Sequence, residues 1–342
     1  MRLEKNVSLA KYSTMRLGGR ASYAATVSRL QEIKEAVTWA GQKNLPIICV
    51  GHGSNIVWRD EGFEGLVLIN RIAGRQFTEQ NSKTAIIRLG AGETWDDCVA
   101  WTVKRGLSGV EALSLIPGTA GATPVQNVGA YGQEIAQTLV ELEAYDVLKE
   151  RFTSIANADC GFGYRTSRFK TADRGRFIIA SVTLKLSLAP PRPPFYEAVR
   201  QYFDRRGIAN PNAADLRAAV VAIRGAKLPD PAKTANCGSF FANPIVSADQ
   251  LERLRQAYPE IKFWPQPDGN FKLAAAWLVE RAGFKGIHDR QTGMATWPVQ
   301  ALVFINERAE STADLLAFKA KVSGRVEALF GVSLIQEPEL LP

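Results

Sequence analysis

The chain has 342 residues, of which 46% are hydrophobic and 22% charged, as in ordinary globular proteins. This length predicts about two or three domains, and a chain of this size needs no disulfide or metal to complete its core. The net charge is +8, yet the basic residues are scattered and no block of five like charges occurs. The pattern therefore argues against a nucleic-acid partner and favours a solubilising surface or anionic small molecules.

Four cysteines occur, at Cys49, Cys98, Cys160 and Cys237. None forms a C-x-x-C pair or has a histidine at zinc spacing, so we expect reduced thiols and no metal site. The first residues lack the apolar stretch of a signal peptide, and no apolar run approaches the ~20 residues of a membrane span. We therefore expect a cytoplasmic protein with no membrane partner.

Residues 1–190 are predicted to alternate strands with helices. The first predicted helix has Ser28 as its N-cap and Gln31 to complete a capping box. Its apolar stripe contains Leu30, Ile33, Val37 and Ala40. A second helix is predicted from about Trp95 to Arg105, with Thr94 as its cap. Short apolar, β-branched runs predict strands at Ile47–Val50, Leu66–Ile69, Ile86–Leu89 and Phe177–Leu186.

Proline-rich segments divide the rest of the chain. Ala189–Pro194 is predicted to be extended, and Leu228–Pro231 is a predicted domain junction. Helices are predicted at Glu197–Arg206, at Ala213–Gly225, from the N-cap Ser247 to about Tyr258, at Lys272–Ala282 and at Thr312–Phe330. A strand is predicted at Ala301–Ile305, and Ser333–Pro342 is expected to be extended and to return to the other domains.

A glycine-rich loop, Gly51–Asn55, directly follows the first buried strand. Exposed backbone N–H groups in such a loop can bind phosphate oxygens. The chain contains neither G-x-G-x-x-G nor the Walker pattern, which argues against a Rossmann fingerprint or a P-loop. A simple glycine-rich turn remains the alternative.

A second glycine-rich segment, Ile116–Gly132, has four glycines and two prolines in seventeen residues, with no charged residue. A disordered linker would be more polar. Small residues let a backbone approach a flat ligand closely, while Gln126, Asn127 and Tyr131 offer polar groups and a ring. The segment therefore predicts a ligand-binding loop, with a buried structural loop as the alternative.

Three single residues stand in unusual surroundings. Arg165 lies among aromatics and glycines, where an arginine faces either a ligand anion or a structural ion-pair partner. Ser239 lies between a glycine and two phenylalanines, as a helix cap or a proton donor. No G-x-S-x-G elbow surrounds Ser239, so a hydrolase-type nucleophile is not expected. Glu337, taken alone, is typical of surface charge.

In this order, these segments resemble the UDP-N-acetylenolpyruvoylglucosamine reductase family over nearly the whole chain. The resemblance begins at Ser13–Gly19, includes Gly51–Asn55 and Pro117–Gly132, and runs through Gly238–Pro244 to Glu337. The length and the insertion that carries Tyr196 resemble the longer subtype of the family, in which a tyrosine loop closes over the substrate.

The resemblance implies an α+β fold: a two-subdomain FAD-binding fold of the vanillyl-alcohol-oxidase type, followed by a smaller α+β substrate-binding domain. The expected boundaries are 1–70 and 71–226 for the two FAD-binding subdomains, 227–330 for the substrate domain, and 331–342 for a segment returning to the active site.

The implied function is the NADPH-dependent reduction of UDP-N-acetylglucosamine enolpyruvate to UDP-N-acetylmuramate in peptidoglycan precursor synthesis. FAD would be bound non-covalently, and no metal is expected. Arg165 would stabilise an enolate form of the substrate, Ser239 would protonate it, and Glu337 would assist. The protein would act as a monomer on small molecules.

Family contacts carry over to matching positions. Flavin contacts are implied for Gly51, His52, Gly53, Ser54, Asn55, Pro117, Gly118, Gly121, Ala122, Gln126, Asn127, Gly129 and Tyr131. Substrate contacts are implied for Tyr164, Tyr196, Lys227, Asn243 and Gln300. Two positions depart from the family pattern: Thr166 stands where an aspartate is common, and His52 replaces a glycine. Thr166 leaves open how Arg165 is positioned.

Two other functions remain open from the sequence. An FAD oxidase acting on a sugar or alcohol would share the flavin segments but would leave Gly238–Pro244 and Glu337 unexplained. A non-catalytic nucleotide-sugar-binding or RNA-binding protein would suit the basic charge, and it predicts a colourless protein where the enzyme predicts a yellow one.

Overall fold

The structure, a computed structural model, describes residues 1–342 and divides the chain into two compact units. The first unit contains Met1–Val7, Ala21–His52 and Phe63–Ala226. The second contains Ser8–Arg20, Gly53–Gly62 and Lys227–Pro342. Residues 8–20 and 53–62, which the sequence analysis assigned to the domain 1–70, thus belong with the C-terminal part of the chain.

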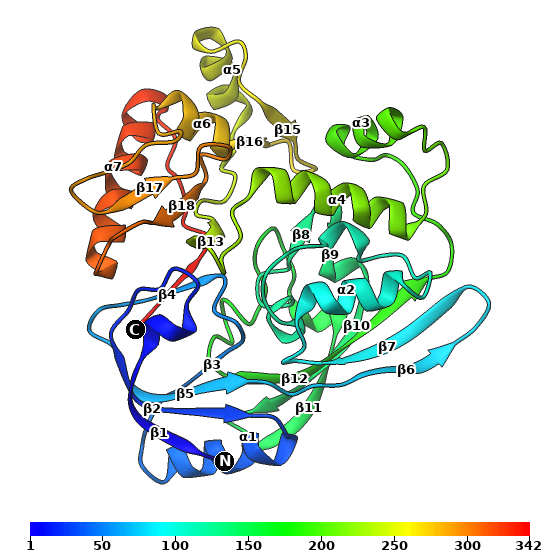
Figure 1. Cartoon of the computed structure of the whole chain (residues 1–342), viewed down its shortest axis with the longest axis vertical. Helices are drawn as coiled ribbons and strands as arrows, with labels where there is room; N and C mark the ends of the chain where they lie inside the picture. Colours follow the sequence, from blue (N-terminus) through cyan, green and yellow to red (C-terminus); the bar gives the residue numbers. More distant parts are fainter. The chain divides into compact units, whose positions relative to one another are not determined.

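The first unit begins with a four-stranded sheet in the order β1-β2-β5-β3, covered on one face by helix α1 (Figure 1). The elements are β1 (Leu3–Ser8), β2 (Arg20–Val27), α1 (Leu30–Gly41), β3 (Ile47–Val50) and β5 (Phe63–Asn70). Strand β5 pairs in parallel with both β2 and β3. The predicted strands at 47–50 and 66–69 are therefore confirmed, and they are neighbours in this sheet.

The start of α1 differs from the prediction by one position. The carboxylate of Glu32, not Gln31, closes the capping box: it accepts hydrogen bonds from the backbone N–H groups of Ser28 (2.8 Å) and Arg29 (3.2 Å). A charged acceptor suits the positive helix end better than a neutral amide. Leu30 is 38% exposed, so it was wrongly placed in the apolar stripe.

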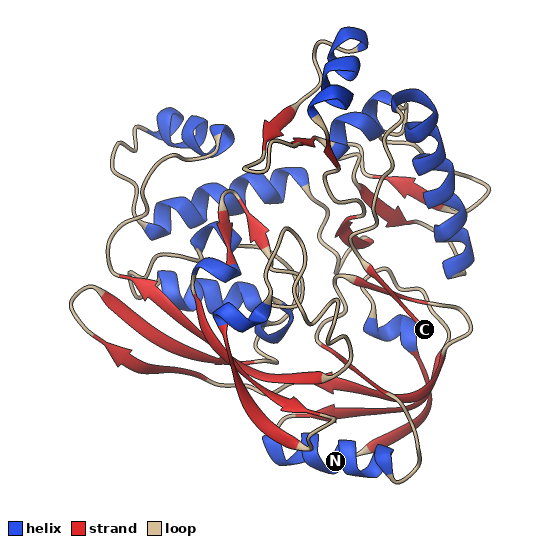
Figure 2. Cartoon of the chain, turned by 180° about the vertical axis from the view of Figure 1, so that it is seen from behind, coloured by secondary structure: helices blue, strands red, loops and turns tan.

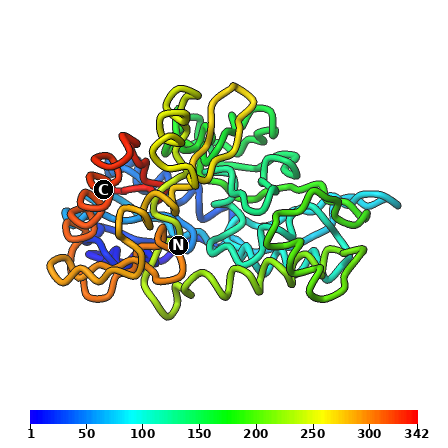
Figure 3. The backbone as a smooth tube through the Cα atoms, turned by 90° about the horizontal axis from the view of Figure 1, so that it is seen from above, coloured from blue at the N-terminus to red at the C-terminus, as the bar shows by residue number.

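A five-stranded antiparallel sheet, in the order β11-β10-β12-β7-β6, follows in the same unit. Its strands are β6 (Arg75–Gln80), β7 (Thr84–Gly90), β10 (Leu139–Asp146), β11 (Arg151–Ala156) and β12 (Phe177–Ser187). The β6–β7 hairpin extends beyond the other strands, with its tip in cyan in Figure 3. The predicted strands at 86–89 and 177–186 are confirmed.

Helix α2 (Trp95–Val103) covers one face of this sheet (Figure 2). It is two residues shorter than predicted, and Thr94, although its N-cap residue, makes no side-chain capping hydrogen bond. Helices α3 (Glu197–Arg206) and α4 (Ala213–Lys227) follow the extended proline segment, close to their predicted bounds.

The second unit combines three small sheets with three α-helices, and the third of these sheets pairs the end of the chain with residues 56–58. Its strands are β13 (Ala235–Ser239), β14 (Ile245–Val246), β15 (Phe263–Pro265), β16 (Phe271–Leu273), β17 (Met294–Thr296) and β18 (Val303–Asn306). Its helices are α5 (Ala248–Ala257), α6 (Ala275–Arg281) and α7 (Thr312–Phe330). The strand orders are β13-β18-β17 and β14-β16-β15. Its core includes a cluster of phenylalanine rings at 240, 241, 304 and 318.

One helix prediction in this unit was wrong at its start, while another was confirmed. Lys272 lies in β16 and not in a helix, because the backbone there pairs with both Ile245 and Trp264. Helix α7 has the predicted bounds, and Ser311 caps it by accepting a hydrogen bond from the N–H of Asp314.

The C-terminal segment pairs with an early part of the chain that belongs to the same unit. Strand β19 (Glu339–Leu341) pairs in parallel with β4 (Ile56–Trp58). Just after β4, the carboxylate of Asp60 accepts hydrogen bonds from the first N–H groups of α7, at Thr312 (2.7 Å) and Ala313 (2.9 Å). These contacts explain why residues 53–62 belong to the second unit.

All four cysteine thiols are free. Cys98, Cys160 and Cys237 are buried and Cys49 is half-buried. No helix of the chain is long and apolar enough to cross a lipid bilayer.

Candidate active site

In the first unit, the segment 117–132 ends in a tight hairpin. Strand β8 (Gly129–Ala130) pairs with β9 (Gln133–Glu134), and the two turn residues both have positive φ, +49° at Tyr131 and +86° at Gly132. Two positive φ values are the mark of a type I′ hairpin turn. The turn places Tyr131 at the hairpin tip, in a conformation that is costly for a tyrosine.

Tyr131 lies against Tyr196, the tyrosine expected to close over the substrate. Their rings meet edge to face at 5.8 Å between centroids, and burial raises the pKa of the Tyr131 phenol. Both residues line a cavity of about 400 Å³. The proline segment 190–194 and its Arg192 also line this cavity. The Tyr196 side chain is 52% exposed.

Arg165 occupies a second two-residue turn with unfavourable backbone geometry. Gly163 and Thr166 exchange backbone hydrogen bonds of 3.1 and 3.3 Å across this turn, and Arg165 has φ +55°. This position normally favours glycine or asparagine. The Arg165 guanidinium donates from Nη2 to the carbonyl of Gly129 at 2.8 Å, which ties the turn to the glycine-rich segment.

Two further contacts join these segments, and one changes the expected role of Asn127. Asn127 is 2% exposed, and its Nδ2 donates to Glu134 (2.9 Å) and to the carbonyl of Gly163 (3.1 Å), while its Oδ1 accepts from the N–H of Ala136. Both N–H groups of the Asn127 amide are thus used by protein partners, so the side chain orders the loop. The hydroxyl of Ser167 donates to the carbonyl of Val125 at 2.6 Å.

The predicted phosphate loop, Gly51–Asn55, divides between the two units after His52. In the first unit, a Cβ at Gly51 would lie 2.4 Å from Thr119 Oγ1, so only glycine fits there. Arg71 Nη1 donates to the Gly51 carbonyl at 3.0 Å. Burial, and then the charge of Arg71, lower the pKa of His52.

Arg71 and Thr119 contact the predicted phosphate loop at Gly51, and neither was named as a candidate from the sequence. Arg71 directly follows the long strand β5, a place where sheet ends carry ligand-binding groups, but an isolated arginine gives no other signal in the sequence. The backbone at Gly51 carries no side chain that would keep a ligand away, and the positive charge of Arg71 lies beside Gly51 and His52. Both features suit the phosphates of a dinucleotide cofactor.

In the second unit, Gly53–Asn55 is held by two neighbours. The carbonyl of Gly53 accepts from the N–H of Thr14 (3.0 Å), and the carbonyl of Asn55 accepts from the N–H of Glu339 (2.9 Å). These residues of the loop are therefore placed by the same strand pairing that anchors the C-terminal segment.

Ser239 and Glu337 lie on neighbouring stretches of backbone in the second unit. Ser239 is the last residue of β13, after a register shift at which Gly238 has φ +76°. The N–H of Glu337 donates to the carbonyl of Phe240 at 2.9 Å, so the two residues lie on adjacent stretches of backbone. Both are half-buried, and the Ser239 hydroxyl has no hydrogen-bond partner within the protein.

Three predicted substrate contacts also lie in this unit. Asn243 Oδ1 accepts from the N–H of Ala275 at the start of α6, while its Nδ2 has no acceptor within the protein. Gln300 lies in the turn before β18, whose Val303 pairs with Ser239. Lys227 is exposed at the end of α4. Lys227, Asn243 and Gln300 therefore share a unit with Ser239.

Comparison with known proteins identifies the family. The FAD binding domain family matches residues 21–148, and the family "UDP-N-acetylenolpyruvoylglucosamine reductase, C-terminal domain" matches residues 230–341. UDP-N-acetylenolpyruvoylglucosamine reductase of Ralstonia nicotianae is 41% identical over 343 residues, covering 99% of each chain. The chain belongs to the UDP-N-acetylenolpyruvoylglucosamine reductase family.

Further relatives agree. The reductase of Pseudomonas aeruginosa is 39% identical over 340 residues, covering 99% of each chain. The crystal structure of UDP-N-acetylenolpyruvylglucosamine reductase from Thermus caldophilus matches the fold with a TM-score of 0.67, at 24% identity and full coverage of both chains. The predicted fold class is confirmed, and FAD is the cofactor of this reductase family member. The roles of individual site residues stay predictions.

Proposed function

We propose that this chain reduces UDP-N-acetylglucosamine enolpyruvate to UDP-N-acetylmuramate, with non-covalent FAD and with NADPH as the hydride donor. Membership of the reductase family supports the substrate and the flavin. The observation that carries the residue roles is the turn of Arg165, held at φ +55° against the carbonyl of Gly129. Strained backbone of this kind is typical of functional positions.

Arg165 would stabilise negative charge on the substrate. FAD, when bound, supplies the hydride chemistry, and the protein supplies orientation and charge. As hydride reaches the enolpyruvyl double bond, charge develops on the carboxylate side as an enolate. A guanidinium remains charged at all working pH values and can bind a carboxylate through two N–H groups. Fixed charge aimed at the developing enolate lowers the barrier.

Ser239 would donate the proton that completes the reduction. Its hydroxyl has no partner in the protein, so it is available to the substrate. A serine is a weak acid, but an enolate carbon is basic enough to accept its proton. Glu337, on the neighbouring backbone, would orient the substrate or the serine. The Nδ2 of Asn243 and the side chain of Gln300 would bind the UDP-sugar, together with Tyr164, Lys227 and Tyr196.

The test is a visible spectrum followed by two additions under anaerobic conditions. The purified protein should be yellow, should lose its flavin bands when NADPH is added, and should regain them when the enolpyruvyl UDP-sugar follows. A flavin that reoxidises in air but ignores the sugar would favour the oxidase. A colourless protein that takes up no FAD would favour the binding protein. The proposal includes a monomeric, cytoplasmic enzyme without nucleic-acid or membrane partners.

A further inference from the structure

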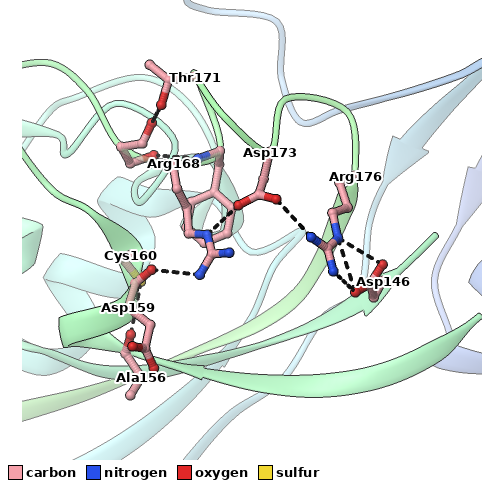
Figure 4. Close-up of polar contacts among 10 residues, drawn as sticks. Asp146, Ala156, Asp159, Cys160, Arg168, Thr171, Asp173 and Arg176 are labelled. Carbon is pink, nitrogen blue, oxygen red and sulfur yellow. Dashed lines mark hydrogen bonds and ion pairs between the residues drawn. The ribbon is translucent and has the colours of Figure 1, made fainter. Parts of the chain in front are cut away.

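The turn of Arg165 sits at the tip of a loop with a closed neck, residues 160–168. The N–H of Arg168 donates to the carbonyl of Cys160 at 2.9 Å. The guanidinium of the same residue donates from Nη1 to the carbonyl of Asp159, also at 2.9 Å (Figure 4). Arg168 therefore closes the loop twice, once with its backbone and once with its side chain.

A chain of ion pairs fixes this neck to the five-stranded sheet. The carboxylate of Asp173 accepts from Nε of Arg168 (2.6 Å) and from Nη1 of Arg176 (3.0 Å). Arg176, just before β12, donates from Nη2 and Nε to Asp146 at the end of β10, at 2.7 and 3.2 Å (Figure 4). The two guanidinium groups also lie over the ring of Phe177, at 5.6 and 4.8 Å.

This network is partly shielded from water and keeps its charges. The side chains of Asp146 and Asp173 are 2% and 12% exposed. Hydrogen bonds from Arg176 and Arg168 hold the pKa values of these two carboxyls below their ordinary range. Shielded, charge-assisted pairs with several hydrogen bonds hold a definite geometry, whereas exposed single pairs do not.

At the tip of the loop, Arg165 donates to the carbonyl of Gly129, and Asn127 donates to the carbonyl of Gly163. Thr166 pairs with Gly163 through its backbone, and its side chain carries no charge that could bind the Arg165 guanidinium as an ion pair. A left-handed arginine persists only where its surroundings over-determine it. The neck of the loop adds a constraint at its base, where Arg168 binds the carbonyls of Cys160 and Asp159.

We infer that Arg168 and Asp173 are positioning residues for Arg165, holding the 160–168 loop so that its guanidinium meets the substrate carboxylate. The inference rests on the proposed function. A purely structural role for the network would lower stability but would leave the step that uses Arg165 unchanged in properly folded protein.

The test compares the two half-reactions of the flavin by stopped flow in Asp173→Asn holoenzyme. Reduction of the flavin by NADPH should stay within about twofold of wild type, since Arg165 takes no part in that step. Reoxidation by the enolpyruvyl UDP-sugar should slow by about tenfold, because displacement of a catalytic group by ~1 Å can cost ~10²-fold. Glu280→Gln, which removes an exposed pair with Lys285, is the control and should change neither rate.

A double-mutant cycle separates positioning from general damage. Asp173→Asn in an Arg165→Lys background should slow reoxidation no further, because the group it positions is already altered. A full tenfold loss in that background, or an equal loss in both half-reactions, would overturn the inference. If Asp173→Asn does not fold, Arg168→Lys keeps the positive charge but loses the fork that reaches both Asp159 and Asp173, and should show the same selective loss. A wild-type enzyme that ignores the sugar overturns the proposed function instead.

Discussion

The two groups of predicted catalytic residues are held in different ways. In the first unit, Arg165 lies on a two-residue turn, and its guanidinium donates to the carbonyl of Gly129. The side chain of Arg168, at the base of the same loop, binds Asp159 and Asp173. In the second unit, Ser239 and Glu337 lie on paired backbone, joined by the hydrogen bond from Glu337 to Phe240. Substitution of a side chain that supports the loop should therefore change the position of Arg165. The position of Ser239 depends on backbone hydrogen bonds and should be less sensitive to substitution of neighbouring side chains.

The largest effect is expected when the proton donor itself is removed. Ser239→Ala should lower turnover by ~10²-fold or more, while FAD binding and flavin reduction by NADPH remain. Steady-state kinetics and the two half-reactions measure this. Ser247→Ala, which removes the N-cap of α5, is a matched control that should cost ~1 kcal/mol of stability without lowering turnover. Equal turnover in wild type and Ser239→Ala would exclude Ser239 as the donor.

Arg165→Lys should have the next largest effect. Lysine keeps the charge but loses the planar fork, so reoxidation by the sugar should slow by ~10- to 10²-fold while NADPH still reduces the flavin. Stopped-flow traces of each half-reaction give the two rates. If only the reduction of the flavin by NADPH slowed in this variant, Arg165 would act on the nicotinamide. The catalytic role proposed for Arg165 beside that of Ser239 would then be wrong.

The anchor of the loop on the sheet should matter for stability. Asp146→Asn removes the charge that Arg176 binds, so we expect a melting temperature about 5 °C lower in differential scanning calorimetry. Glu252→Gln, which alters the exposed contact with Arg255, should shift it far less. Equal melting temperatures for wild type and Asp146→Asn would show that the network anchors nothing.

The smallest effect is expected at α1, which carries none of the predicted catalytic residues. The N–H of Ser28 and the guanidinium of Arg29 lower the pKa of Glu32 to about 2. The folded state thus binds fewer protons, and this stabilisation is complete above the unfolded pKa near 4.5 and is lost as pH falls towards 2. Glu32→Gln should be ~1 kcal/mol less stable at neutral pH in urea titrations, and the difference should vanish near pH 2. If the difference in stability between wild type and Glu32→Gln stayed constant across this pH range, the ionised Glu32 carboxylate would not be the source of the stabilisation.

Regular elements could be predicted because local pattern determines them. Helix α7 has a capped start, a long apolar stripe and a terminal glycine, and its predicted bounds are those of the structure. Lys272 was assigned wrongly because strand pairing with Ile245 and Trp264, far away in sequence, prevails over a helical pattern. The capping position of Glu32 was missed because Ser28 and Gln31 match the same motif one residue earlier.

The sequence indicated the segments of the candidate site but not the contacts within them. Glycine-rich composition identified 117–132, yet nothing local indicated that Asn127 would be buried among Glu134, Gly163 and Ala136. Arg71 was missed for the same reason: its importance comes from a carbonyl at Gly51, twenty residues away. Long-range side-chain contacts of this kind require the three-dimensional arrangement.

The parallel pairing of β19 with β4 has a consequence for how the protein is made. The second unit needs residues 8–20 and 53–62, which leave the ribosome early, together with Glu339–Leu341, which leave it late. All of the first unit has been synthesised once Ala226 has emerged, so it can fold during translation. The two early segments can contact each other before that, since the N–H of Thr14 donates to the carbonyl of Gly53, but β4 lacks its partner strand until synthesis is almost finished. Deletion of the last four residues should therefore leave β4 without that partner.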